Sequence, residues 1–250
     1  MSETSLRVKL LDVTSRAVAL IYAACRQCYS SRSAGALLED PQADGARQAA
    51  FIRKVVASGH ESPLEHAKFT FGIEGVSRAL THQLVRHRIA SFSQQSQRYV
   101  RESAFDYVVP PSIARDPGLK AEFVRTMEHI QERYNSLVDK FKACGREGER
   151  AFEDARFVLP QAAETKIVVT MNARELLHFF RHRCCARAQW EIKRLAGEML
   201  RLARRELPEV FEGAGAKCVD LRYCPEGARF SCGRYPLKED AVLKRRRRKK

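Results

Sequence analysis

Residues 119–141 carry apolar side chains at the spacing of one helical face, and this periodicity sets the fold class. Its apolar stripe consists of Phe123, Met127, Ile130, Tyr134, Leu137 and Phe141. Other helical patterns cover residues 14–29, 44–58 and 188–206. Strand patterns occur only at 68–74 and 165–170. Helices outnumber strands and do not alternate with them, so we predict an α+β fold, mostly helical with a small antiparallel sheet.

Capping residues mark where several elements begin. Ser77 starts a helix that we expect to end around residues 86–88, and Asn172 to Glu175 has the spacing of a capping box. Residues 99–109 are expected to be extended, and Pro110 and Pro111 stop them. We expect 1–215 to form the main domain, with a Cys/Gly/Pro-rich extension at 216–236 and a disordered basic tail at 237–250.

The charge balance favours anionic ligands. The formal net charge is +15, and seven of these charges fall in residues 244–250, which leaves +8 on the rest. A body this basic suits nucleotides and folates. Membrane spans of roughly 18 apolar residues and a secretory signal are both absent from the sequence, so the expected location is cytoplasmic.

The eight cysteines do not predict a disulfide framework in a cytosolic chain. Cys218, Cys224 and Cys232 could hold zinc, but their spacings are long and a structural site needs a fourth ligand that is not obvious nearby. His60 and His66 are six residues apart with a proline between them, unlike the histidines of a zinc protease helix. We predict no metal site.

The segment from Gln83 to Tyr99 is the one most suited to ligand binding. Its triplet Arg86-His87-Arg88 points in directions about 100° apart if helical, and a Ser/Gln-rich segment without acidic residues follows. Many directed donors with fixed positive charge suit a phosphate ester and a planar amide base. The alternative is a solvated helix end whose arginines oppose the macrodipole.

Arg86-His87-Arg88 followed after seven residues by Ser96 resembles the RHR-x7-S signature of flavin-dependent thymidylate synthases (ThyX). Further segments resemble family blocks in the same order, over roughly residues 10–210. They are residues 60–66 (HESPLEH), 158–160 (VLP), 172–174 (NAR) and 187–191 (RAQWE).

The resemblance implies an enzyme that converts dUMP to dTMP. FAD would be the cofactor, 5,10-methylenetetrahydrofolate the carbon donor and NADPH the reductant, giving tetrahydrofolate. The family's homotetramer with shared active sites is the expected assembly. Two alternatives stay open: an RNA-binding module, suggested by the basic tail, and another flavin or folate enzyme on a related scaffold.

The resemblance also implies roles for individual residues. FAD-binding positions are His60, Ser62, Arg86, His87, Arg88, Ile89, Gln94, Asn172, Arg174 and His178. Positions for dUMP are Gln83, Arg86, Gln94, Gln95, Ser96, Gln97, Arg98, Arg156 and Arg183. We assign Arg183 to stabilising charge on the uracil carbonyls and Ser96 to binding and polarisation rather than covalent attack. Cys28 departs from a serine that contacts flavin in some members, and Cys184-Cys185 is expected to be core rather than a nucleophile.

Overall fold

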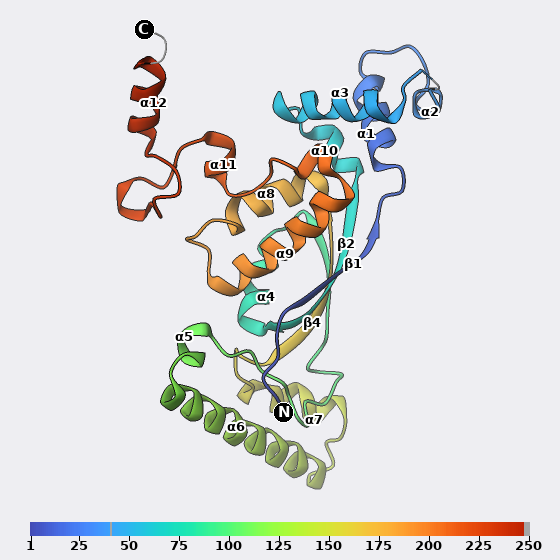
Figure 1. The fold of residues 1–250 in the computed structure, drawn as a ribbon. Helices are drawn as coiled ribbons and strands as arrows, with labels where there is room; N and C mark the ends of the chain where they lie inside the picture. Colours follow the sequence, from blue (N-terminus) through green and yellow to red (C-terminus); the bar gives the residue numbers. More distant parts are fainter. Residues whose placement is uncertain (41, 248–250) are drawn as a thin grey trace. The chain divides into compact units, whose positions relative to one another are not determined.

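The computed structural model describes residues 1–40 and 42–247 (Figure 1). Within these residues the chain forms twelve α-helices, three short 3-10 helices and four strands, which confirms the α+β prediction. It divides into two compact units, each assembled from several chain segments. One comprises residues 1–9, 72–86 and 92–169, and the other comprises residues 10–71, 87–91 and 170–250.

The four strands form one antiparallel sheet in the order β1-β2-β4-β3. Their bounds are β1 Arg7–Val13, β2 Lys68–Ser77, β3 Ala90–Gln94 and β4 Glu164–Asn172. The register of β2 against β4 follows from side-chain contacts: Thr70 and Thr170 hydroxyls lie 3.0 Å apart, and Gly75 N donates to Glu164 Oε1 at 2.9 Å. The strands expected at 68–74 and 165–170 are confirmed, whereas β1 and β3 were not predicted.

The first unit has its core around the long helix α6. Its helices are α4 Arg78–Leu84, α5 Pro111–Ala114, α6 Pro117–Ala143, α7 Glu149–Ala155 and η2 Arg156–Val158. Met127, Tyr134 and Val138 lie on the buried face of α6, which confirms the amphipathic helix predicted there. Burying side chains of this size contributes about 1.5–3 kcal/mol each to the hydrophobic stabilisation.

The second unit holds the remaining described helices. They are α1 Ala17–Gln27, α2 Ala34–Leu38, α3 Gly45–Ala57, η1 Ser62–His66, α8 Ala173–Arg183, α9 Trp190–Glu206, α10 Pro208–Phe211, α11 Lys217–Leu221, η3 Ala228–Phe230 and α12 Lys238–Arg247. Phe211 packs edge-on against Phe69 and Phe180, with ring centroids 5.5 and 5.9 Å away. Such aromatic pairs add about 0.5–1.5 kcal/mol beyond their burial, so α8, α10 and β2 share one core.

Gly75 lets the residues just before β1 approach β2 closely. Its φ is +68°, and a Cβ at this position would lie 2.0 Å from the Ser5 carbonyl oxygen. Both the backbone conformation and the space therefore require glycine here.

Two regions differ from the sequence-based predictions. Helix α4 ends at Leu84, so the 86–88 triplet follows the helix, and residues 90–94 form a strand where a loop was expected. Lys238–Arg247 forms α12, and 248–250 lie outside the described residues. The division of the chain into 1–215, 216–236 and a disordered tail at 237–250 stays a prediction.

No helix in the described part of the chain has the length and apolar character needed to cross a membrane.

Candidate functional site

A buried histidine joins the triplet 86–88 to helix α8. His87 is 7% exposed, and its Nδ1 lies 3.3 Å from Glu175 Oε1. Arg183 Nε donates a hydrogen bond to His87 Nε2 at 3.1 Å. Because a guanidinium can only donate, Nε2 must be the acceptor, so Nδ1 carries the proton and donates to Glu175. The contacts thereby fix the neutral tautomer of His87.

The charges around His87 support this assignment. Burial, together with the nearby Arg183, His178 and His182, lowers the pKa of His87 to about 4. Burial raises the pKa of Glu175 and lowers that of Arg183. His87 is within ion-pair distance of Glu175, but its low pKa keeps it neutral near pH 7, so the contact is a hydrogen bond rather than an ion pair.

Aromatic rings enclose the same histidine. The Phe179 ring lies edge-on to His87 with centroids 4.9 Å apart, and the His178 ring lies 5.9 Å away. His87, Glu175 and His178 are the one group in the described chain with three ligand atoms within 4.8 Å of one another. Arg183 already donates to His87 Nε2, and a divalent cation beside that guanidinium is electrostatically disfavoured.

A cavity of about 640 Å³ lies between α1, α3 and η1 in the second unit. His60, Ser62 and Arg174, three of the predicted FAD residues, line it, together with Cys28 and the exposed Tyr29. The lining therefore offers aromatic surface for a ring and a cation for a phosphate, the groups that a flavin nucleotide needs. The residues present therefore fit this cofactor.

Ion pairs hold the wall of this cavity. Arg174 pairs with Glu65, and Arg181 Nη2 lies 2.6 Å from Glu61. Asn172 caps α8, because its Oδ1 accepts from Glu175 N at 2.8 Å. The predicted capping box at 172–175 is confirmed in this respect, and Asn172 Nδ2 is left for other contacts.

In the first unit, two glutamines of the polar segment are fixed by the sheet. Gln94 Nε2 donates to the hydroxyls of Thr81 and Thr165, at 3.2 Å each. Gln95 N donates to Lys166 O at 2.9 Å, and its side chain reaches Glu102 at 3.4 Å. Strand β3 therefore positions this part of the segment.

The turn after β3 carries Ser96 and Arg98. Ser96 Oγ accepts from Arg98 N at 3.2 Å, which leaves the Ser96 hydroxyl hydrogen for a ligand. The Arg98 guanidinium pairs with Glu149 and Glu153 of α7, so a phosphate would compete with two carboxylates for it. Arg156 Nε donates to Glu153 O at 3.1 Å.

Gln97 has a buried donor without a partner. The side chain is 8% exposed, and its Nε2 is the one buried side-chain polar atom that lacks a hydrogen bond within the described residues. Leaving such a group unsatisfied costs about 1–3 kcal/mol. A ligand acceptor at this position would remove that cost.

The predicted site residues fall into two groups. Those in the second unit are His60, Ser62, His87, Arg88, Ile89, Asn172, Arg174, His178 and Arg183. Those in the first unit are Gln83, Arg86, Gln94, Gln95, Ser96, Gln97, Arg98 and Arg156. The structure brings His87, His178 and Arg183 together, and His60, Ser62 and Arg174 around one cavity. Arg86, Arg88 and Ile89 are exposed.

Two residues of these groups were missed from the sequence. Glu175 was assigned only to the capping box, yet its buried carboxylate holds His87. Arg78 lies beside Gln95, and burial and the neighbouring Arg156 lower the pKa of its guanidinium. Its position at the start of the helix predicted from Ser77 was the only available signal.

Comparison with known proteins agrees with these features. The model of the family "Thymidylate synthase complementing protein" (Thy1) matches residues 9–209 and so ends before the extension at 216–236. A flavin-dependent thymidylate synthase from Nitratidesulfovibrio vulgaris is 57% identical over 96% of this chain and 99% of its own. One from Geobacter sulfurreducens is 50% identical, over 92% of this chain and 94% of its own.

A solved structure supports the fold. The crystal structure of the UMP/dUMP methylase PolB from Streptomyces cacaoi, bound with 5-Br dUMP, superposes with a TM-score of 0.70 at 26% identity. It covers 84% of this chain and 95% of its own. Since the family model matches most of the chain and the relatives match nearly all of it, the chain belongs to the flavin-dependent thymidylate synthase (Thy1) family.

Proposed function

We propose that this protein converts dUMP to dTMP, with FAD as cofactor, methylenetetrahydrofolate as carbon donor and NADPH as reductant. The observation that carries the geometric part of the proposal is the Arg183–His87–Glu175 chain of hydrogen bonds. It fixes one edge of the Arg183 guanidinium through Nε. Within the described residues its two terminal amino groups donate to no protein acceptor, so they are available to a substrate.

Uracil C5 is a weak nucleophile, and negative charge develops on the ring carbonyls as it attacks the carbon donor. A preorganised cation at those oxygens lowers this barrier without reorganisation. Arg183 has that role in our proposal, because neutral His87 accepts its Nε–H and adds no competing charge. Glu175 is then a positioning residue, since it touches His87 and not the substrate.

The segment 94–98 holds the nucleotide in this account. The unpartnered Gln97 Nε2 supplies a donor to a base carbonyl, and the Ser96 hydroxyl polarises the ring or its phosphate. Arg98 and Arg156 carry the charge that suits the phosphate. Ser96 is not assigned to covalent attack.

The cavity around η1 holds the cofactor in this account. His60, Ser62 and Arg174 would contact FAD there, with His178 and Asn172 on α8. When bound, the reduced flavin supplies the hydride for methyl formation. The protein's part is to bind, orient and exclude water.

We also infer a homotetramer with shared active sites and a cytoplasmic location. Exposed apolar side chains in the first unit support an assembly, because Phe157 is 83% exposed and Tyr99 is 64% exposed. Exposed patches of large apolar groups mark interaction sites. Native mass spectrometry would give the tetramer mass, and a monomer at micromolar concentration would contradict this inference.

An absorbance scan followed by an NADPH oxidation assay tests the function. We expect a flavin spectrum in the purified protein and NADPH oxidation coupled to dTMP formation that needs both dUMP and methylenetetrahydrofolate. A folded protein that neither retains nor takes up FAD would contradict the proposal. So would oxidation that proceeds to the same extent without dUMP and forms no dTMP.

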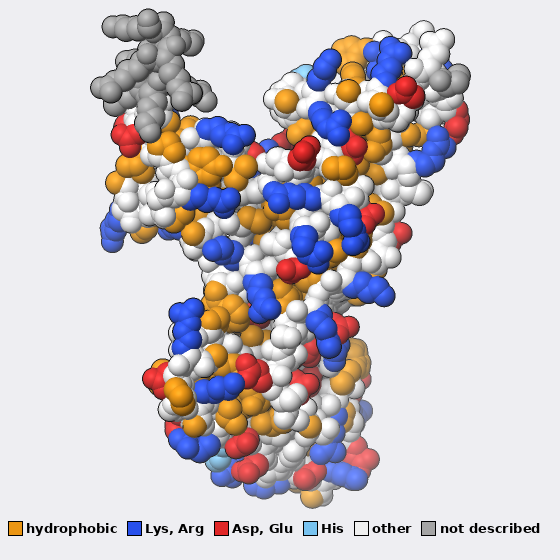
Figure 2. Space-filling view, in the orientation of Figure 1, with side chains coloured by type: hydrophobic (Ala, Val, Ile, Leu, Met, Phe, Trp, Pro, Cys, Tyr) orange, Lys and Arg blue, Asp and Glu red, His pale blue; other side chains and the backbone are white. Residues whose placement is uncertain are grey.

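Binding of nucleic acid by the basic tail stays a separate prediction. Residues 244–250 lie outside the side chains that the structure describes. On the face shown in Figure 2, Lys and Arg side chains alternate with acidic ones instead of forming one continuous basic surface. A gel shift that compares the full chain with a 1–236 truncation tests whether any binding is confined to the tail.

A further inference from the structure

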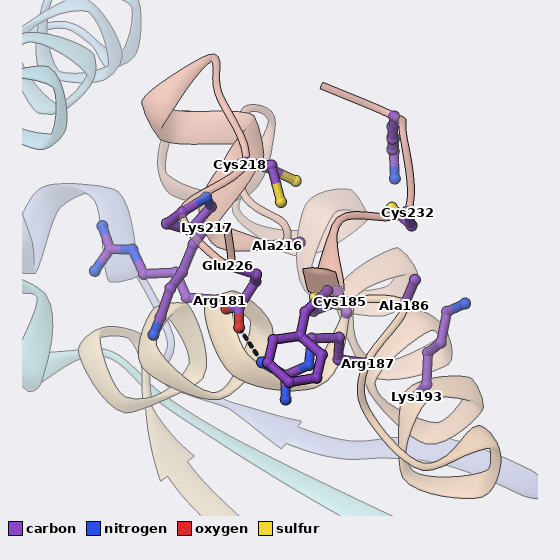
Figure 3. A pocket seen from close by; sticks show the side chains of 15 residues that line it. Arg181, Cys185, Ala186, Arg187, Lys193, Ala216, Lys217, Cys218, Glu226 and Cys232 are labelled. Atoms are coloured by element: carbon purple, nitrogen blue, oxygen red, sulfur yellow. Dashed lines mark hydrogen bonds and ion pairs between the residues drawn. The ribbon is translucent and has the colours of Figure 1, made fainter. Parts of the chain in front are cut away.

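A cavity in the second unit is lined by five of the chain's eight cysteines. It has a volume of about 170 Å³, and its cysteines are Cys184, Cys185, Cys218, Cys224 and Cys232. All five are free thiols. Figure 3 shows Cys185 next to the end of α8, with Cys218 and Cys232 on the chain that follows α9. None of the predicted FAD and dUMP residues lines this cavity.

Three contacts attach the extension 216–236 to the last turn of α8 and the loop that follows it. Arg187 pairs with Glu226, the dashed line in Figure 3, and its guanidinium stacks 4.2 Å from the Phe230 ring centre. Arg181 Nε lies 3.0 Å from Asp220. These contacts hold Cys185 opposite the cysteines of the extension.

A backbone bridge closes the extension on itself. Cys224 N donates to Pro236 O at 2.7 Å, and Cys224 pairs with Leu237 in an isolated β-bridge. The intervening residues form a loop that returns Cys232 to the cavity lined by Cys224. Cys224 and Cys232 of this loop therefore line the same cavity as Cys218 and Cys185.

We propose that Cys185, Cys218, Cys224 and Cys232 form a metal site that binds one Zn²⁺ through four thiolates. Structural zinc sites are tetrahedral and closed, with four Cys or His ligands. The three cysteines of the extension are one ligand short, and the fold supplies the missing one from the loop after α8. This inference does not depend on the proposed enzymatic function.

The neighbours of each thiol indicate why Cys185, and not Cys184, is the fourth ligand. Cys218 has the thiols of both Cys185 and Cys224 as electrostatic neighbours. The charged neighbours of Cys184 are instead Arg204 and Lys193. Cys184 also lines the cavity, but its charged neighbours lie on α9 and no other thiol is among its electrostatic neighbours, so it provides a matched control.

The charge of the cavity wall suits a tetrathiolate centre. Zn²⁺ with four thiolates carries a net charge of −2, because four thiols lose four protons on binding the cation. The described lining contains one acidic residue, Glu226, and five cationic ones: Arg181, Arg187, Lys193, Lys217 and Arg234. Nearby cations favour thiolates over thiols, so they stabilise the charge of the bound state.

The thiols surround the cavity without being at coordinating distance. No three cysteine sulfurs in the described chain lie within 4.8 Å of one another. Zinc ligands sit at about 2.3 Å from the metal, so binding must draw the extension towards Cys185. Metal binding of this kind contributes to folding, and we expect it to order residues 216–236.

Metal analysis of the full-length protein tests the site. After incubation with Zn²⁺ and desalting, we expect one zinc per chain. Cys218→Ser and Cys224→Ser should each lower the bound zinc at least tenfold. Cys184→Ser and Cys144→Ser should keep it, since Cys184 is not one of the four proposed ligands and Cys144 does not line the cavity. Equal zinc in all four variants, or none in the unsubstituted protein, would overturn the proposal.

Cobalt gives a second test that does not depend on the variants. Co²⁺ bound by four thiolates absorbs in the red, beyond the flavin bands, and that absorption should disappear when Zn²⁺ is added. Flavin content and circular dichroism of Cys218→Ser show whether the variant is folded. A metal-free protein in which two of these thiols form a disulfide, or one that holds iron and inorganic sulfide instead, would contradict the zinc site.

Discussion

The chain contains the triplet Arg-His-Arg twice, and the two copies have opposite patterns of burial. In residues 86–88 the histidine is buried and both arginines are exposed. In residues 181–183 the histidine is exposed and both arginines are half-buried. The first copy follows the end of α4, whereas the second occupies the last turn of α8.

The comparison shows that the chemistry of such a triplet depends on which of its three side chains is buried. His87 follows the end of α4 in sequence and is buried beside Phe179, and this burial keeps it neutral. Arg183 continues the α8 helix at a position that directs its Nε to His87. The two triplets therefore act together, with the histidine of one copy holding an arginine of the other.

The largest effect expected is on turnover in Arg183→Ala. Removing a preorganised charge from a developing anion costs about 10²–10³-fold in kcat. Bound FAD should remain, because the cavity residues His60 and Arg174 are unchanged. Steady-state kinetics with flavin quantitation measures both. Wild-type kcat in the variant would remove Arg183 from the mechanism.

His87→Ala tests how much the buried histidine contributes to stability, in contrast to the exposed His182. The substitution leaves Glu175 without its hydrogen-bond partner in the core, which should lower the free energy of unfolding by about 1–3 kcal/mol. Urea denaturation followed by circular dichroism measures the change. An unfolding midpoint equal to that of the unsubstituted protein would show that this contact does not stabilise the fold.

Glu175→Gln keeps the shape of the contact and removes the charge. A glutamine side-chain carbonyl still accepts from His87 Nδ1, but more weakly than a carboxylate. We expect kcat/KM to fall about fivefold, equivalent to about 1 kcal/mol, with the loss in kcat rather than in KM for dUMP. Glu175→Leu, which cannot accept, should lose more. Equal activity in both variants would show that Glu175 does not position Arg183.

Acid should lower the free energy of unfolding through the buried His87. His87 has a pKa of about 4 in the fold against about 6.5 when exposed, so the unfolded chain binds its proton first as the pH falls. The contribution of His87 to the free energy of unfolding is complete above about pH 6.5 and is lost towards pH 4. Glu175, whose pKa is raised, contributes with the opposite slope.

His87→Gln isolates the histidine contribution from that of Glu175, Arg183, His178 and His182, which face it. The free energy of unfolding should change less with pH between 6.5 and 4 in the variant than in the unsubstituted protein. The same pH slope in both proteins would contradict the assigned neutral state.

The smallest effect is expected for His182→Ala. His182 is exposed, and among the described residues its hydrogen-bond and ring contacts are with His178 alone: its Nδ1 lies 2.8 Å from the His178 carbonyl oxygen and the two ring centroids are 4.3 Å apart. Exposed substitutions of this kind change stability by about 0.5 kcal/mol or less. Activity should stay within about twofold of the unsubstituted protein. A loss comparable to that of His87→Ala would erase the contrast between the triplets.

Local signals allowed much of the fold to be predicted. Ser77 and Asn172 cap α4 and α8 as expected, because capping depends on residues within one turn. Strands β1 and β3 were missed, since β1 mixes charged and apolar residues and β3 is a polar Ser/Gln stretch. Their pairing depends on partners distant in sequence.

The candidate site was predictable by position but not by contact. The segment 86–98 and α8 were identified from their residues, and the structure adds the contacts between their side chains. Nothing local tells that Glu175 faces His87, 88 residues away in sequence, or that Arg98 is paired with Glu149 and Glu153. For the same reason, the sequence did not predict that Cys185 lines one cavity with the cysteines of the extension.

The most direct test of the account compares dTMP formation by the unsubstituted protein and by Arg183→Ala, both saturated with FAD, at saturating dUMP, methylenetetrahydrofolate and NADPH. The account predicts that the first protein forms dTMP and that the rate of dTMP formation by the second is at least about a hundredfold lower. Equal rates from the two proteins, or no dTMP from either, would contradict it.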